Sequence, residues 1–244
     1  MKPTWLTFVD ERRRFSLLNI LAALSGLQDK QEPDFILIGA LPLLISDYLH
    51  YTALWDIDLL FRSERDLMEF VKKPKTEGLR VINYDDELVI NENIASFHSA
   101  WTFDKNWFNV DYILQNDLFQ FFAAERTHSA PFHQVVDWQD INLEILLFQA
   151  HPWDIIVSKI VSPRAVRDIA LRVDMSIDIR HIFATYQVEK DNVDFWQHIT
   201  SRAQFFCGVP AFKRRFLELL ETAPELGYQD IEISPTATQA LKGI

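Results

Sequence analysis

The spacing of apolar residues changes once along this chain, and this change limits its possible folds more than any other feature of the sequence. Up to about residue 150, short apolar runs alternate with polar breaks, which is the pattern of strands joined by turns. From Pro152 onward, apolar residues recur at intervals of three and four, as in packed helices. The pattern predicts an α+β fold, with a mixed sheet flanked by helices at residues 1–150 and a helical domain at residues 151–244. The segment after Pro224 is expected to be irregular.

The sheet region is expected to contain three helices among its strands. Apolar residues at helical spacing end near Gly26, and Ser63 followed by Asp66 is typical of a helix start. Another helix is predicted over Ala40–Tyr51, because Pro42 falls in its first turn, where no amide donor is needed. The predicted strands are Phe35–Ile38, Leu54–Phe61, Leu79–Tyr84, Glu87–Ile90, Ala95–Phe103, Trp107–Leu114, His133–Trp138 and Ile141–Phe148.

Glycine is scarce, with 6 residues in 244, and no two glycines lie close enough to share a loop. The Walker phosphate loop and the dinucleotide-binding fingerprint both need clustered glycines, so that the backbone can wrap a phosphate. Both motifs are therefore excluded. Gly39 follows an apolar run and precedes a predicted helix, which is a position where a phosphate can approach backbone amides.

The chain is strongly acidic, with 24 basic and 35 acidic residues and a net charge of −11. Nucleic-acid binding depends on neutralising phosphates, so this charge disfavours RNA and DNA unless basic residues cluster. Cys207 is the only cysteine and cannot form an intramolecular disulfide, which is typical of a reducing compartment. The longest apolar run, Phe35–Ile45, is well short of the ~20 residues that cross a bilayer. We therefore expect a cytoplasmic protein without a membrane segment.

Two acids interrupt the apolar strand predicted over residues 54–61. Residues two apart in a strand point to the same face, so Asp56 and Asp58 are expected to stand side by side. Adjacent carboxylates repel, and hard oxygen ligands on a rigid strand suit Mg²⁺ or Mn²⁺. Asp111 lies among apolar residues of a later predicted strand, where an acid is costly without a partner, and would supply a third ligand. The alternative, which the residues leave open, is a pair of solvent-facing acids on an edge strand.

The order of these motifs resembles that of the nucleotidyltransferase superfamily, which has the DNA polymerase beta-like fold. Within it, the chain is similar to bacterial nucleotidyltransferase-like proteins related to abortive-infection toxins. The family pattern is an apolar strand ending in Gly-Gly or Gly-Ser, a helix, an Asp-x-Asp or Asp-x-Glu strand, and a third acid on a later strand. The resemblance covers roughly residues 34–185. Its matching segments are Ile36–Ala40, Asp56–Leu60 and Val110–Tyr112, followed by a helix with Lys159 and by Arg164, Arg167, Asp174 and Asp178.

This resemblance implies a metal-dependent enzyme that moves a nucleoside monophosphate from a nucleoside triphosphate to a hydroxyl on a nucleic acid, a protein or a small molecule. RNA is a candidate acceptor that the net charge disfavours. Ala40 stands where the family usually has Gly or Ser, so the alternative is a non-catalytic protein of this fold that binds a protein partner or serves in a toxin-antitoxin pair. The implied catalytic and metal-binding residues are Asp56, Asp58 and Asp111, and the implied phosphate-binding residues are Gly39, Ala40 and Lys159.

Overall fold

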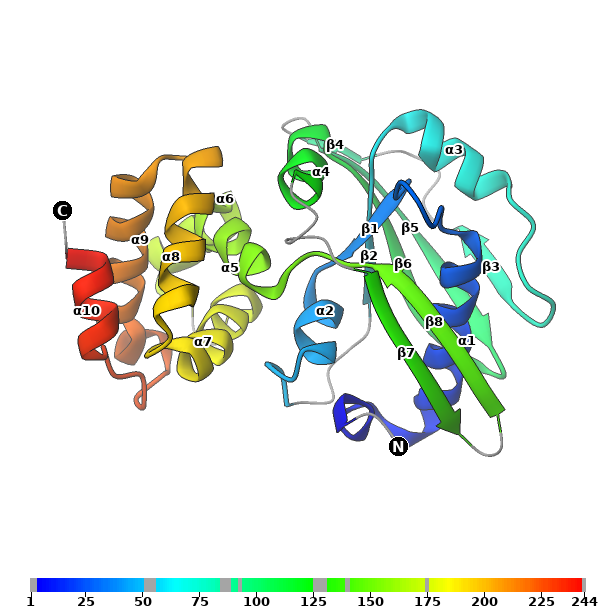
Figure 1. Ribbon diagram of the computed structural model, residues 1–244, viewed down its shortest axis with the longest axis horizontal. Helices are drawn as coiled ribbons and strands as arrows, with labels where there is room; N and C mark the ends of the chain where they lie inside the picture. The colour runs from blue at the N-terminus through cyan, green and yellow to red at the C-terminus, as the bar shows by residue number, and fades with distance from the viewer. Residues whose placement is uncertain are drawn as a thin grey trace. The chain divides into compact units, whose positions relative to one another are not determined.

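The computed structural model describes residues 4–50, 56–83, 89–91, 94–124, 131–138, 141–173 and 176–242. The chain divides into two compact units, Met1–His151 and Pro152–Ile244. The first unit is built on a mixed sheet with helices against it, and the second is helical (Figure 1). The predicted α+β class, with a mixed sheet flanked by helices and followed by a helical region, is confirmed.

A six-stranded mixed sheet forms the centre of the N-terminal unit. Its strands are β1 (Phe35–Ile38), β2 (Asp56–Phe61), β3 (Arg80–Asn83), β4 (Val89–Asn91), β5 (Ile94–Phe103) and β6 (Asn106–Leu114). The order is β1-β2-β6-β5-β3, and β4 pairs with β5. The β2 and β6 strands run parallel, whereas the other pairs are antiparallel. The parallel pair places Asp58 opposite Asp111 and Asp56 opposite Asn109.

Two helices, α1 (Glu11–Leu27) and α3 (Glu64–Lys72), pack on one face of this sheet. The Ser16 hydroxyl of α1 donates a 2.6 Å hydrogen bond to the Phe103 carbonyl of β5. Phe70 of α3 stacks on Trp101. The strand residues buried on this face include Ile57, Leu59, Phe61, Trp101, Phe108, Val110 and Tyr112. Because side chains alternate along a strand, Asp56, Asp58 and Asp111 lie on the opposite face.

A separate two-stranded antiparallel ribbon completes the strands of the N-terminal unit. It consists of β7 (Pro131–Trp138) and β8 (Ile141–Phe148), and β8 packs against α1. The Ser25 hydroxyl of α1 donates to the Leu146 carbonyl of β8 and accepts from the Leu146 amide, each at 2.9 Å. Immediately after β8, the Ala150 amide donates a 2.9 Å hydrogen bond to the Leu37 carbonyl of β1. These contacts attach the ribbon to the sheet.

The α2 helix (Ala40–Ile45) is shorter than the predicted span Ala40–Tyr51, and that prediction was wrong in its end point. Asp47 has a left-handed backbone, with φ of 62°, and the Tyr48 amide donates to the Leu43 carbonyl. This combination closes a helix. Tyr51 lies outside the described residues, as do the predicted strand ends Leu54, Tyr84 and Glu87.

Two helices appear where the sequence analysis predicted none. The α4 helix (Asn116–Ala123) buries all three of its phenylalanines, which give it an apolar side although the run is too short for clear periodicity. The α10 helix (Pro235–Lys242) lies in the tail expected to be irregular, so that expectation was wrong. Its first turn is held by Ser234, whose hydroxyl accepts a 3.1 Å hydrogen bond from the Ala237 amide.

Helices make up the C-terminal unit. They are α5 (Pro152–Val161), α6 (Pro163–Ala170), α7 (Ile177–Glu189), α8 (Val193–Arg202), α9 (Val209–Glu221) and α10. This unit also has 3₁₀ turns at Ala203–Phe205 and Ala223–Leu226, and the N-terminal unit has one at Thr4–Phe8. Tyr186, Trp196 and Phe216 contact one another in the core of this unit. None of the helices in the described part of the chain is long and apolar enough to cross a membrane.

Candidate metal centre

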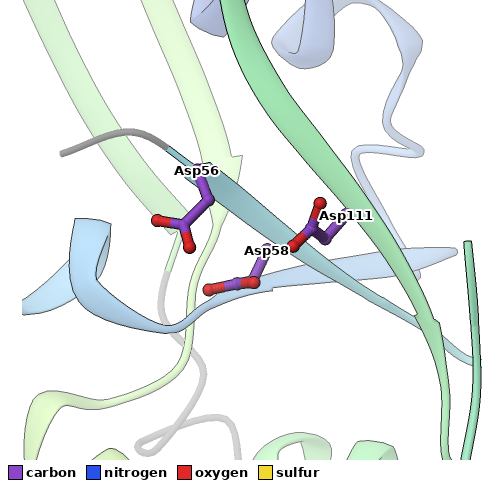
Figure 2. A group of neighbouring side chains, drawn as sticks. All are labelled: Asp56, Asp58 and Asp111. Carbon is purple, nitrogen blue, oxygen red and sulfur yellow. The ribbon is translucent and has the colours of Figure 1, made fainter. Parts of the chain in front are cut away.

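Three carboxylates converge on the sheet face opposite α1 and α3. Asp56 and Asp58 come from β2 and Asp111 from the neighbouring β6, and we call these residues the acidic triad (Figure 2). One carboxylate oxygen from each lies within 4.8 Å of the other two. Asp56 is exposed, whereas Asp58 and Asp111 are half-buried. The fold therefore brings together the Asp56–Asp58 pair and Asp111, which lie far apart in the sequence.

The local sequence explains this convergence. Ile57 and Val110 are fully buried and lie opposite each other in the parallel β2–β6 pair. Burying them on the helix-covered face turns the flanking acids to the other face, because shifting the register by one residue would reverse every side chain. The apolar residues between the acids thus determine where the acids point.

Gly39 makes room for one member of the triad. It follows β1 and precedes α2, and its backbone has φ of 78° and ψ of −143°, which L side chains rarely adopt. A Cβ atom at this position would lie 1.8 Å from Oδ2 of Asp58. Ala40, the first residue of α2, is next to it. The structure therefore places the predicted Gly39–Ala40 turn directly beside the acidic triad.

His98 on β5 is part of this centre, although the sequence analysis did not identify it. It lies opposite Asp111 in the antiparallel β5–β6 pair, and its Nδ1 is 2.8 Å from Oδ1 of Asp111. This contact orients one oxygen of the Asp111 carboxylate. The sequence shows that His98 lies within a predicted strand. It does not show that His98 faces Asp111, because that depends on the register between β5 and β6.

The chemistry of the triad fits a hard divalent cation. Two full negative charges 4.8 Å apart repel each other by about 3 kcal/mol at an effective dielectric constant of about 20. The three residues offer oxygen ligands, which Mg²⁺ and Mn²⁺ prefer, and their half-exposed position leaves access for a substrate. Asp56, Asp58 and Asp111 are therefore suited to hold Mg²⁺ or Mn²⁺.

Lys159, the remaining predicted site residue, lies on α5 in the C-terminal unit. Its ammonium group forms an ion pair with Asp178 of α7, and the side chain is 16% exposed. The Arg164 guanidinium lies 3.6 Å from the other Asp178 oxygen. Asp174 is outside the described residues. A contact between Lys159 and a phosphate stays a prediction.

Another charged cluster lies in the core of the C-terminal unit, around Asp154 of α5. Its carboxylate is fully buried, 2.8 Å from Nε2 of His198 and 3.1 Å from Nε of Arg202. A second nitrogen of Arg202 donates to the other Asp154 oxygen at 3.1 Å. This bidentate pair joins α5 to α8 and provides the partners that a buried carboxylate needs.

Comparison with known proteins identifies similar structures but no sequence family. No family model matches the chain, and no curated protein matches it. A proposed nucleotidyltransferase from Helicobacter pylori is similar over 96% of this chain and 92% of its own, with 13% identity and a TM-score of 0.48. JHP933 from Helicobacter pylori is similar over 96% of this chain and 89% of its own, with 13% identity and a TM-score of 0.47. Similarity at this level assigns no activity to the chain.

Proposed function

We propose that this protein is a metal-dependent nucleotidyltransferase, which moves a nucleoside monophosphate from a nucleoside triphosphate to an acceptor hydroxyl. The observation that carries the proposal is a convergence of carboxylates on one sheet face. One carboxylate oxygen from each of Asp56, Asp58 and Asp111 lies within 4.8 Å of the other two. The order of motifs along the chain, which includes these acids together with Gly39 and the helix that follows it, resembles that of the nucleotidyltransferase superfamily and also supports the proposal. The acceptor is a nucleic acid, a protein or a small molecule.

In this proposal the acidic triad binds Mg²⁺ or Mn²⁺ and receives a proton. When bound, the ions neutralise charge on the triphosphate and lower the pKa of the acceptor hydroxyl. Asp111, held by His98, accepts the hydroxyl proton. The hydroxyl oxygen forms a bond to the α-phosphorus, the bond from that phosphorus to the bridging oxygen breaks, and pyrophosphate leaves with the bonding electrons.

The turn at Gly39 and Ala40 is the proposed triphosphate side of the centre, because Gly39 packs against Asp58. Ala40 has no hydroxyl, so this turn offers only backbone groups to a phosphate. Lys159 is proposed to offset phosphate charge as a point charge, on the strength of its motif alone.

Nucleotide binding and pyrophosphate release test this function together. The wild-type protein is expected to bind a nucleoside triphosphate in isothermal titration only when Mg²⁺ or Mn²⁺ is present, and to release pyrophosphate when an acceptor is supplied. The Asp56→Ala/Asp58→Ala double variant is expected to lose both. Asp117→Asn, which alters an exposed acid on α4 of the same unit, is the matched control and should retain both.

Two results would argue against the enzyme. The absence of metal-dependent nucleotide binding by the wild-type protein would refute the proposal. Metal-dependent binding without pyrophosphate release, across RNA, protein and small-molecule acceptors, would instead favour the non-catalytic binding protein, for which the alanine at position 40 is the structural sign.

A further inference from the structure

The sheet face that carries the acidic triad continues along β6 as a strip of uncharged side chains. Trp107, Asn109 and Asp111 alternate with the buried Phe108 and Val110, so these three lie on the same face. Asn109 and Asp111 are half-buried, and Trp107 is 47% exposed. The strand therefore presents an indole, a carboxamide and a carboxylate in succession on the side of the sheet where the triad lies.

This face also exposes two large apolar side chains, Trp107 and Ile82. Ile82 on β3 is 58% exposed, and it lies opposite Ala100, which in turn lies opposite Asn109. The strands β3, β5 and β6 are adjacent (Figure 1), and this pairing places Ile82 and Trp107 on the same face of the sheet. Among the described residues of this unit, the other large apolar side chain with comparable exposure is Met68 on α3. Exposed apolar side chains gathered beside a polar centre are typical of ligand-binding surfaces.

The order of groups along β6 matches the order of groups in a nucleotide. Successive same-face residues of a strand are about 7 Å apart, so Asn109 and Trp107 lie about 7 and 13 Å along the strand from Asp111. Asn109 is also opposite Asp56, next to the proposed metal ligands. A nucleotide has charged phosphates at one end, a ribose with hydroxyl groups in the middle, and a flat uncharged base at the other end.

We propose that β6 binds the nucleoside part of the substrate nucleotide, with Asn109 hydrogen-bonding the ribose and Trp107 stacking on the base. This inference rests on the proposed nucleotidyltransferase function. A carboxamide both donates and accepts hydrogen bonds, as ribose hydroxyls do. An indole face stacks on any base, since every base has a π face, so binding by Trp107 selects for a nucleotide over a bare polyphosphate and discriminates little among the four bases.

The test compares nucleotides with inorganic tripolyphosphate, which has the phosphates but no nucleoside. Titrations of ATP, GTP, CTP, UTP and tripolyphosphate are made in the presence of Mg²⁺. Trp107→Ala is expected to weaken binding of all four nucleotides by about 5- to 150-fold, and Trp107→Phe by less, while tripolyphosphate affinity stays unchanged. Met68→Ala, which removes an equally exposed apolar side chain from α3, is the matched control and should change neither affinity.

A second variant tests the other half of the inference. Asn109→Ala is expected to weaken nucleotide binding by about 2- to 10-fold and to leave tripolyphosphate binding unchanged. Substituting the Trp107 side chain keeps the Trp107 backbone carbonyl, which accepts a 2.6 Å hydrogen bond from the Arg13 guanidinium. Thermal unfolding verifies that each variant is folded.

The outcomes separate this inference from the function on which it rests. Nucleotide affinity that is unchanged in Trp107→Ala, or a loss shared equally by nucleotides and tripolyphosphate, would overturn the role of β6 and leave the proposed function standing. A wild-type protein that binds neither nucleotides nor tripolyphosphate in the presence of Mg²⁺ would overturn both.

Discussion

Asp154 in the C-terminal unit and the acidic triad in the N-terminal unit have different kinds of neighbours. In the C-terminal unit, buried Asp154 lies against His198 and Arg202, so the fold itself provides the countercharge. In the N-terminal unit, the three carboxylates of the acidic triad lie close to one another, and Asp111 also contacts His98. Like charges held together cost free energy, and a divalent cation shared by the three carboxylates reverses that cost. The difference contrasts a carboxylate that joins two helices with three carboxylates that we propose bind a metal ion.

The largest expected effect is on the free energy of unfolding, which should respond differently to substitution of Asp154 and of Asp58. Asp154→Asn should lower the free energy of unfolding of the C-terminal unit by about 3–5 kcal/mol, because it leaves the buried Arg202 without its carboxylate. Asp58→Asn, measured without divalent cations, should lower the stability of the N-terminal unit by less, because it also relieves repulsion among the carboxylates of the acidic triad. Chemical denaturation of both variants checks the comparison, which fails if Asp58→Asn is the more destabilising.

The two glycines that precede α2 and α9 offer a matched test of the centre. Gly39 and Gly208 both have positive φ, 78° and 75°, which L side chains rarely adopt, so alanine should cost about 1–3 kcal/mol of strain at either position. Only at Gly39 would the new Cβ meet Asp58, whereas it would meet nothing within 4 Å at Gly208. Gly39→Ala should therefore abolish Mn²⁺ binding, and Gly208→Ala should leave it intact. Equal Mn²⁺ affinities in both variants would refute the role assigned to Gly39.

A smaller effect is expected at His98, the residue that orients Asp111. An asparagine places an N–H near the position of the histidine Nδ1, whereas a glutamine places it one bond farther along. His98→Gln should weaken Mn²⁺ binding about 10- to 100-fold, as is usual when an orienting partner is lost, and His98→Asn should retain most of the affinity. Calorimetry measures both constants. Identical losses in the two variants would indicate that the Nδ1 contact has no orienting role.

The smallest expected effect concerns the C-terminal unit and pH. Burial, reinforced by the charge of Lys159, lowers the pKa of His181 to about 3 from its ordinary 6.5. The unfolded state therefore binds the proton more readily, so the stability contribution is present above pH 6.5 and is lost as pH falls. Between pH 7 and 5.5 this loss is about 1.3 kcal/mol. His181→Leu should reduce the decrease in unfolding free energy over that range, and an unchanged pH dependence would count against a buried neutral imidazole.

The strands were the part of the fold that the sequence predicted best. Alternation of apolar and polar residues, as in residues 107–114, depends on neighbouring residues alone and matches β6 within one residue. The helices were less well predicted, because the end of α2 depends on the left-handed backbone of Asp47 and α10 lies in a tail without a clear apolar period. Local spacing predicts which segments are strands more reliably than it predicts where short helices begin and end.

The candidate site shows the same limit. Period-two spacing predicts that Asp56 and Asp58 share a face, but the proximity of Asp111 requires β2 and β6 to be adjacent and parallel, which no local pattern states. His98 was missed for the same reason, because it meets Asp111 only through the β5–β6 register. Gly39 was singled out for phosphate access, whereas the structure adds a second reason for it in the packing of Asp58.

Direct measurement of divalent-cation binding tests whether the acidic triad is a metal site. Mn²⁺ is titrated into the wild-type protein, the Asp58→Asn/Asp111→Asn variant and the Asp117→Asn control, each verified as folded. We expect one saturable class of Mn²⁺ sites in the wild-type protein and in the control, and its loss from the double variant. Equal Mn²⁺ binding by all three proteins, or no binding by the wild-type protein, would rule out a metal site at the acidic triad.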